Sequence, residues 1–379
     1  MFDSLRKIFS PDRSAIGVSF GTHTIRLAHC GREKTEHTML EAATCPVPDD
    51  VQTNPAVRSR FYVDALKTAI IRGKFTTRRA VLGIPNYMIQ VRQLRVPKVE
   101  KGQLSSAIEA EISSKLPTDL SRFTLRHSVA GDVQNEQGTR QEVIVFAIET
   151  DALQKLLADA ESAGLDVVGV SVEPKAVVDC FAHVYRRKAD EFAVSMFIDV
   201  GASGTRCIIA QGSRTLFTRA IAVGGEELGR PEVLPDDTTL LRSNPGVRVH
   251  AVSIGESDTV STTSASNVAS SADSTSDLRR SVISRLADEL DMCRRYHEVT
   301  FTNLPIDRLM FVGGASQDHS MLRLIADRLQ LPVQLADPMV RMNRRATINP
   351  DCGLDRRMPQ PAWASAIGLS LGNSDAEQK

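Results

Sequence analysis

Two segments far apart in the chain follow the same plan, and this repeat constrains the fold more than any other feature of the sequence. Residues 15–28 read AIGVSFGTHTIRLA, and residues 196–210 read MFIDVGASGTRCIIA. Each passes from an apolar strand through a glycine turn with small hydroxyl residues into a second strand. A unit that recurs in this way indicates a duplicated α/β fold, and a chain of 379 residues is long enough for two lobes.

Three glycine turns, at residues 19–24, 199–205 and 313–316, carry the most suggestive chemistry. Glycine lets backbone amides approach a phosphate because no Cβ stands in the way. Asp199 is a candidate to hold Mg²⁺ through water, since this ion keeps much of its hydration shell. Each turn alone is also typical of an ordinary hairpin, but the three in this order favour a phosphate site. The chain has neither a Walker loop nor a GxGxxG turn that opens a helix.

Composition argues against several other classes of protein. The 46 Lys and Arg residues balance 46 Asp and Glu residues, so no overall charge favours nucleic acid or an acidic membrane. The six cysteines are scattered without a CxxC pair, which argues against a zinc site and favours a reducing cytoplasm. No apolar stretch approaches the roughly 20 residues that cross a bilayer, so we predict no transmembrane segment.

The residue pattern changes after the first lobe. We predict an amphipathic helix over 101–117, two strands over 123–133 and 141–149, and a helix over 150–165, which together form a small inserted α+β unit. Further on, residues 255–277 are almost all Ser, Thr, Ala, Asp and Asn. Such a segment cannot bury enough apolar surface to offset its ordering entropy, and we predict that it is disordered.

The ordered set of motifs resembles the actin-like ATPase superfamily and, more closely, the PilM family of type IV pilus assembly proteins, also called competence protein A-like. Beyond the two repeats, the matching segments are EAEISSKLP, AGLDVVGVSVEPKAV, GGEEL, FVGGASQ, LQLPVQLADP and AIGLSLG. The resemblance covers most of the chain except residues 231–277. The cell-division protein FtsA has the same subdomain plan and is easily confused with this family.

This resemblance implies a duplicated ribonuclease H-like fold, in which two lobes surround a nucleotide cleft and an FtsA-type α+β subdomain is inserted. The implied partition is an N-terminal arm (1–14), a first lobe (15–97 and 164–194), the inserted subdomain (98–163), a second lobe (195–230 and 300–379) and a small upper subdomain (231–299).

The resemblance also implies which residues hold ATP and Mg²⁺. Glu173 lies where the superfamily positions a water or metal and is the candidate catalytic residue, although a glutamate before Pro174 is also typical of a helix start. Asp199 is the candidate metal residue, with a turn-capping role as its alternative. The candidate nucleotide-binding positions are Gly21, Thr22, Thr24, Gly201, Ala202, Ser203, Gly224, Gly225, Gly313, Gly314 and Ala315.

Two departures from the family pattern stand out. Ser19 occupies the position of an expected aspartate, and the loss of that charge predicts weak or absent ATP hydrolysis. Pro231 interrupts the helix expected after GGEEL, so the adenine side of the cleft is expected to differ from the family pattern.

The function implied is a cytoplasmic scaffold, peripheral to the inner membrane, for a type IV pilus or a related secretion or DNA-uptake machine. Its implied partners are the cytoplasmic tail of a PilN-like membrane protein and the pilus motor ATPase apparatus, with self-association also plausible and no nucleic acid. We expect the tail to bind in a groove near Ile108, Ile112 and Leu116. The alternatives are an interaction module that no longer binds nucleotide, an FtsA-like tether, and a small-molecule kinase.

Overall fold

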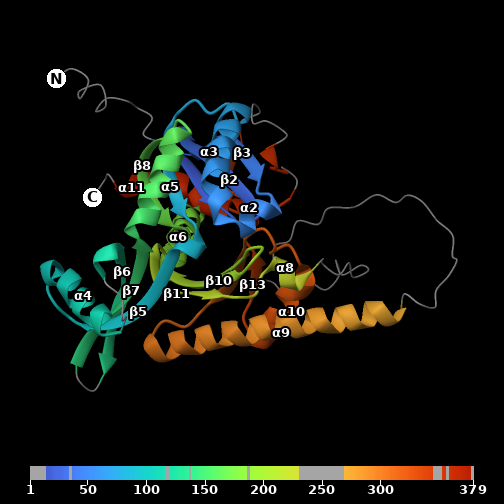
Figure 1. Ribbon diagram of the computed structural model, residues 1–379. Helices are drawn as coiled ribbons and strands as arrows, with labels where there is room; N and C mark the ends of the chain where they lie inside the picture. Colours follow the sequence, from blue (N-terminus) through green and yellow to red (C-terminus); the bar gives the residue numbers. More distant parts are fainter. Residues whose placement is uncertain are drawn as a thin grey trace.

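The fold is built on two large β-sheets, each of which contains one of the repeated hairpins (Figure 1). The computed structural model describes residues 14–33, 36–115, 120–135, 138–185, 188–229, 269–344, 352–355 and 358–376. The expected N-terminal arm up to residue 13, residue 230 of the expected second lobe, and residues 231–268 of the expected upper subdomain lie outside these ranges. Within the described ranges, no helix combines the length and the apolar character needed to span a membrane.

The first sheet has the strand order β14-β3-β2-β1-β4-β8. Its strands are β1 (Ile16–Phe20), β2 (Thr24–Glu33), β3 (Glu36–Pro46), β4 (Arg79–Ile84), β8 (Asp166–Val172) and β14 (Met342–Arg344). Strand β1 is antiparallel to β2 and parallel to β4. Every residue of β1 is buried, as expected for an apolar strand in the middle of a covered sheet.

The second sheet repeats this plan, with the order β11-β10-β9-β12-β13. Its strands are β9 (Val194–Val200), β10 (Thr205–Gln211), β11 (Arg214–Ile221), β12 (Arg308–Val312) and β13 (Val333–Leu335). Strand β9 is antiparallel to β10 and parallel to β12, just as β1 is to its two neighbours. The duplication predicted from the repeat is therefore present in the sheet topology.

Helices α6 (Glu173–Val184) and α11 (Ala364–Ala376) join the two sheets through one shared core. Glycine permits their close approach. A Cβ on Gly17 of β1 would lie 2.0 Å from the Ala366 carbonyl oxygen, and one on Gly368 would lie 1.8 Å from the Ala176 carbonyl oxygen. The small residues of the last helix therefore serve close packing.

The outer faces of the sheets are covered by the remaining long helices. Helices α3 (Pro55–Arg72) and α5 (Thr150–Ser162) share a core with the first sheet, and α2 (Asp49–Thr53) lies beside α3. Helices α9 (Ala269–Thr300) and α10 (His319–Leu329) share a core with the second sheet.

Helix α9 begins within the stretch predicted to be disordered, so that prediction is wrong from Ala269 onward, while residues 255–268 lie outside the described ranges. A packed helix extends readily because each added residue forms one more hydrogen bond.

A third, small sheet carries the inserted unit. It consists of β5 (Ile89–Pro97), β7 (Gly138–Glu149) and β6 (Phe123–Asn135), in that order, with α4 (Leu104–Lys115) on one face. Strand β5, which the predicted partition assigns to the first lobe, pairs along its whole length with β7, since Leu94 and Val96 bury against α4. Likewise β14 and α11, predicted in the second lobe, lie against the first sheet.

The small sheet is fastened to α9 by a buried carboxylate. Glu142 of β7 is only 1% exposed. Its Oε2 accepts a hydrogen bond from Arg95 Nε at 2.8 Å, and its Oε1 accepts one from Tyr296 Oη of α9 at 2.6 Å. Arg95 also donates to Thr300 Oγ1, at 3.0 Å. These bonds connect the inserted unit to the far side of the second sheet.

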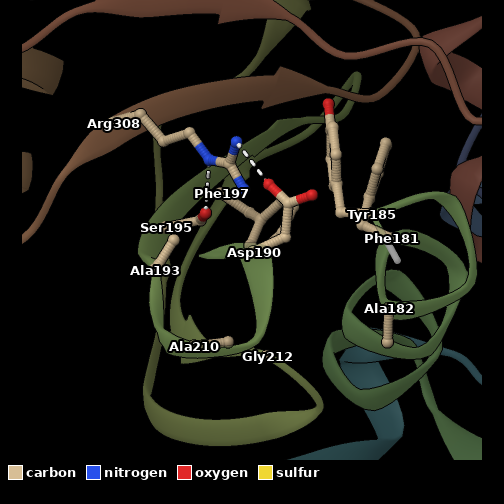
Figure 2. Close-up of a pocket in the computed structure, with 10 residues that line it drawn as sticks. All are labelled: Phe181, Ala182, Tyr185, Asp190, Ala193, Ser195, Phe197, Ala210, Gly212 and Arg308. Atoms are coloured by element: carbon tan, nitrogen blue, oxygen red, sulfur yellow. Dashed lines mark hydrogen bonds and ion pairs between the residues drawn. The ribbon is translucent and has the colours of Figure 1, made fainter. Parts of the chain in front are cut away.

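A small hollow lies at the end of α6, near the start of β9 (Figure 2). Its cavity volume is about 20 Å³, enough for one water molecule. Arg308 lines the hollow: the guanidinium stacks 4.5 Å from the centre of the Tyr185 ring and donates from Nε to Ser195 Oγ at 2.8 Å. A second guanidinium nitrogen lies 3.7 Å from Asp190. The hollow is thus closed by the protein's own side chains and is too small for a nucleotide.

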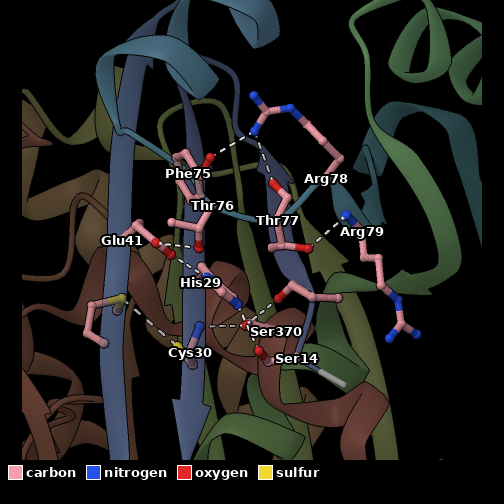
Figure 3. Close-up of polar contacts among 12 residues, drawn as sticks. Ser14, His29, Cys30, Glu41, Phe75, Thr76, Thr77, Arg78, Arg79 and Ser370 are labelled. Atoms are coloured by element: carbon pink, nitrogen blue, oxygen red, sulfur yellow. Dashed lines mark hydrogen bonds and ion pairs between the residues drawn. The ribbon is translucent and has the colours of Figure 1, made fainter. Parts of the chain in front are cut away.

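A polar cluster at the amino end of β1 ties β2 to β3 (Figure 3). Ser14 Oγ lies 2.8 Å from His29 Nε2, and His29 Nδ1 contacts Glu41 Oε2. Thr76 Oγ1 donates to Glu41 Oε1 at 2.9 Å. Burial acts to raise the pKa of the Glu41 carboxyl, but the bonds from His29 and Thr76 outweigh it and the pKa lies below its ordinary value.

Replacing Glu41 by glutamine is expected to lower the free energy of unfolding by about 1.5–3 kcal/mol near neutral pH, because charge-assisted hydrogen bonds are lost. A carboxyl with a depressed folded-state pKa stabilises the protein above its ordinary pKa and loses that effect as the pH falls through the folded value. The gap between the two proteins therefore narrows toward acid pH in urea denaturation curves. The exposed Glu109 supplies the control, Glu109→Gln, and an equal gap at all pH values would contradict the assignment.

Candidate functional site

The two glycine turns of the repeat meet face to face. The first turn joins β1 to β2, and the second joins β9 to β10. Thr22 Oγ1 and Ser203 Oγ lie 2.8 Å apart across the junction, and His23 Nε2 lies 2.7 Å from Glu226 Oε1 of α8 (Gly225–Leu228). The two large sheets are therefore bridged at this junction by side chains from both halves.

Both turns are closed by the same internal hydrogen bond. Gly21 N–H donates to the Thr24 carbonyl at 3.1 Å, and Gly201 N–H donates to the Gly204 carbonyl at 2.9 Å. In the described part of the chain, the amides of Thr22 and Ser203 next to them have no acceptor. Such amides on glycine-bearing turns are suitable donors for an anion.

The glycine pairs predicted beside the nucleotide pack on the second turn. Gly225 N–H donates to the Gly201 carbonyl at 2.9 Å. A Cβ on Gly224 would lie 2.3 Å from the Ala202 carbonyl oxygen, and one on Gly225 would lie 2.8 Å from the Ala315 side chain. Four predicted positions thus stand in contact around Gly201.

The third glycine turn closes against Asp199. Gly313 has a φ of 93°, and a Cβ there would lie 2.5 Å from Asp199 Oδ1. Glycine alone meets both requirements, because other residues rarely adopt this φ and any side chain would collide with the carboxylate. The structure therefore brings all three turns to one place. Thr24 closes the first turn through its carbonyl, and Gly314 follows Gly313 in the third.

Both candidate acidic residues are buried where the two halves meet and share one partner. Glu173, at the first turn of α6, and Asp199, at the end of β9, are each 4% exposed. Arg206 of β10 donates from Nε to Asp199 Oδ2 at 3.1 Å and also contacts Glu173 Oε2. Ser19 Oγ donates to Glu173 Oε1 at 2.9 Å. A single guanidinium therefore bridges the carboxylates of the two halves.

Arg206 and Arg26 are the site residues that sequence reasoning missed. They occupy matching places in the repeat: Arg206 lies opposite Asp199 in the β9–β10 ladder, and Arg26 lies opposite Ser19 in the β1–β2 ladder. The available signal was the hairpin itself, since pairing across a short turn places each arginine beside the residue that precedes the turn. Counting back across both turns would have found them.

The two arginines differ in their surroundings. Burial acts to lower the pKa of Arg206, but Asp199 and Glu173 outweigh it and the pKa lies above its ordinary value. For Arg26 burial is the larger effect, and its pKa lies below the ordinary value despite the same two carboxylates. In the described part of the chain, Arg26 has no hydrogen-bond or ion-pair partner. Its guanidinium nitrogens lie 3.9 Å and 3.8 Å from where a Cβ would stand on Gly21 and Gly314.

The donor set does not fit the magnesium ion predicted at Asp199. A hydrated Mg²⁺ needs carboxylate oxygens that are free to hold its waters, whereas both oxygens of Glu173 and one of Asp199 accept hydrogen bonds from the protein. Among the described residues, no group of three or more His, Cys, Asp or Glu side chains could hold a metal. The cation beside these carboxylates is a guanidinium.

Comparison with known proteins identifies the family and the fold. Residues 17–232, more than half of the chain, match the sequence profile of the type IV pilus assembly protein PilM. The solved PilM-PilN type IV pilus biogenesis complex contains a similar chain, with a TM-score of 0.70, 18% identity, and coverage of 96% of this chain and 99% of that one. The ethanolamine utilization protein EutJ from Carboxydothermus hydrogenoformans is more distant, at a TM-score of 0.44 and 13% identity, with coverage of 96% and 90%.

The likeness to the chain of the PilM-PilN complex agrees with the topology described above. The fold class predicted from the sequence, a duplicated actin-like ATPase fold with an inserted α+β subdomain, is confirmed by the paired sheets and by the likeness over nearly the whole chain. The profile match includes both halves of the repeat and the inserted unit. The chain belongs to the PilM family of type IV pilus assembly proteins.

Proposed function

We propose that this protein is a scaffold on the cytoplasmic face of the inner membrane, where it binds the cytoplasmic tail of a PilN-like protein. The observation that carries the proposal is the likeness to the PilM-PilN complex over 96% of the chain, together with the family match. Contact with a pilus motor ATPase and self-association belong to the same proposal as further roles. A related secretion or DNA-uptake machine remains the alternative setting.

Nucleotide binding in the cleft is the second part of the proposal. It is supported by the three glycine turns that meet at one place and, among the described residues, by turn amides without acceptors and a guanidinium without a hydrogen-bond or ion-pair partner. Hydrolysis is expected to be very slow. Ser19 supplies no charge, and both oxygens of Glu173 are engaged, so neither residue can orient a water as phosphoryl transfer requires.

The tail cannot bind in the groove predicted around Ile108, Ile112 and Leu116. Ile108 and Ile112 are 3% and 1% exposed and belong to the core of the small sheet, because the apolar face of α4 packs inward on β5 and β7. They cannot contact a partner without unfolding this unit. Leu116 lies outside the described residues.

Tyr87 marks a better surface for the tail. It lies in the short turn Asn86–Met88 that connects β4 of the first sheet to β5 of the small sheet, and it is 60% exposed. Arg58 of α3 stacks 4.4 Å from the centre of its ring. An exposed aromatic ring held in place by a cation is typical of an interface anchor, and here it stands at the seam between the two units.

The change Tyr87→Ala is expected to weaken binding of a PilN-like cytoplasmic peptide about tenfold or more, which corresponds to the loss of an anchor residue. Binding is measured by fluorescence anisotropy of the labelled peptide. Phe192→Ala provides the matched control, because Phe192 is also an exposed aromatic residue, at 73%, but lies next to β9 on another part of the surface. Unchanged affinity in the Tyr87 variant would refute this location, whereas absent binding by the parent protein would refute the partner.

A further inference from the structure

Arg206 contacts both Asp199, the residue at which the sequence predicts Mg²⁺, and Glu173. We propose that the cleft binds the phosphates of its ligand without a metal ion, with Arg206 as a permanent counter-charge to Asp199 and Glu173. The inference rests on the nucleotide site of the proposed function and specifies how that site is regulated: Mg²⁺ does not control its occupancy.

Electrostatics explains why a built-in cation can replace a bound one. Two carboxylates in a cleft repel an incoming phosphate, and a metal ion helps the phosphate to bind by cancelling that repulsion. Arg206 supplies half of this cancellation, because its single positive charge contacts Asp199 and Glu173 together. The charges of these two acids and of Arg206 and Arg26 sum to zero without any ion.

Displacement of Arg206 by a hydrated metal ion would be costly. The Arg206 side chain is 13% exposed, and the side chains of Asp199 and Glu173 are each 5% exposed. An ion that took their oxygens would leave a buried guanidinium without partners, and a buried unpaired charge is strongly destabilising. Ser19 stands where the family pattern has an aspartate, so the site lacks that carboxylate as a metal ligand. The Ser19 hydroxyl does not replace it, because it donates to Glu173.

Arg26 provides the complementary attraction for the ligand. Its guanidinium lies between the first and third glycine turns and, within the described ranges, makes no hydrogen bond or ion pair. A planar guanidinium presents paired donors that match phosphate oxygens. The site thus contains one arginine that bridges its two acids and a second that completes the charge balance and has donors available to an anion.

The primary test compares the affinity of the purified full-length protein for a fluorescent ATP analogue in buffer with Mg²⁺ and in buffer with EDTA. We expect the two dissociation constants to agree within about threefold. Electron paramagnetic resonance of Mn²⁺ gives an independent reading. Protein added to Mn²⁺ alone is expected to leave the free Mn²⁺ signal unchanged. Protein added to Mn²⁺ with nucleotide is expected to leave that signal no lower than nucleotide alone does. Neither measurement requires a variant.

A charge-removing variant gives the converse result. Arg206→Gln frees the oxygens of Asp199 and Glu173, so nucleotide affinity is expected to fall at least about tenfold in EDTA and to recover in part with Mg²⁺. The control is Arg214→Gln, an exposed arginine on the neighbouring strand β11. Circular dichroism establishes first that each variant is folded.

Three outcomes separate the claims. A loss of tenfold or more in parent-protein affinity on removal of Mg²⁺ would overturn metal independence while leaving the nucleotide site standing. A lack of saturable binding in both buffers would overturn the nucleotide site and this inference together. Neither result bears on the PilN-like tail, whose binding is measured separately and in the absence of nucleotide.

Discussion

Replacing Arg206 by leucine is expected to lower the free energy of unfolding by about 3–5 kcal/mol, the cost of breaking a buried ion pair from one side. The reason is that Asp199 and Glu173, each 4% exposed, would remain charged inside the cleft without a counter-ion. The loss also removes a bond between the two large sheets, because Glu173 follows β8 and Asp199 ends β9. Urea denaturation followed by circular dichroism measures the change.

Two further variants sharpen this expectation. Arg214→Leu removes an exposed arginine from the same sheet and is expected to change the free energy of unfolding by no more than about 0.5 kcal/mol. The double variant Arg206→Leu with Glu173→Gln removes one of the two stranded charges and is expected to regain part of the stability. If Arg206→Leu proved as stable as the parent, the guanidinium would not be the partner of these acids.

The second large effect is expected at Gly368, where alanine should cost about 3 kcal/mol or more of folding free energy. A Cβ at this position would lie 1.8 Å from the carbonyl oxygen of Ala176 and 2.6 Å from its carbonyl carbon. Both atoms are backbone of α6, so the contact is relieved only if the two helices separate, and overpacking of this kind reaches the upper end of its usual range. The midpoint of thermal unfolding reports the effect.

Two other glycines calibrate that result. Gly102 has nothing within 4 Å of its ideal Cβ position, and Gly102→Ala is expected to be neutral within about 0.5 kcal/mol. Gly372 lies on the same helix as Gly368, but its nearest neighbour, at 2.9 Å, is the side chain of Asp179, which can move aside. Equal effects of alanine at Gly368 and Gly372 would show that α11 does not fit as tightly as described.

The glycine turns were predictable because their chemistry is local. A turn with a small residue between two apolar strands can be recognised in a single segment, and two copies of it predict two sheets. The same is true of Asp199 and Glu173, each of which directly follows or ends a strand. That these positions lie together in space follows from the duplicated topology.

The errors have a common physical origin in tertiary contacts. Periodicity identified α4 as amphipathic but could not tell whether Ile108 and Ile112 face a partner or the small sheet, since both surfaces are apolar. Strand β5 alternates in the same way whichever sheet it joins. The role of Arg206 depends on strand register and on a carboxylate that lies 33 positions away in the sequence, and neither is visible within one segment.

The clasp between Glu142 and helix α9 determines how a pull on this protein would be distributed. If the proposed tail binds near Tyr87, a pull on it would act on the strand that carries Arg95, and the hydrogen bonds to Tyr296 and Thr300 would pass that force to α9. The force would thus reach the second sheet through helix α9 rather than through the two hairpins that meet between the sheets. A force applied in this way would then load the periphery of the molecule before its centre.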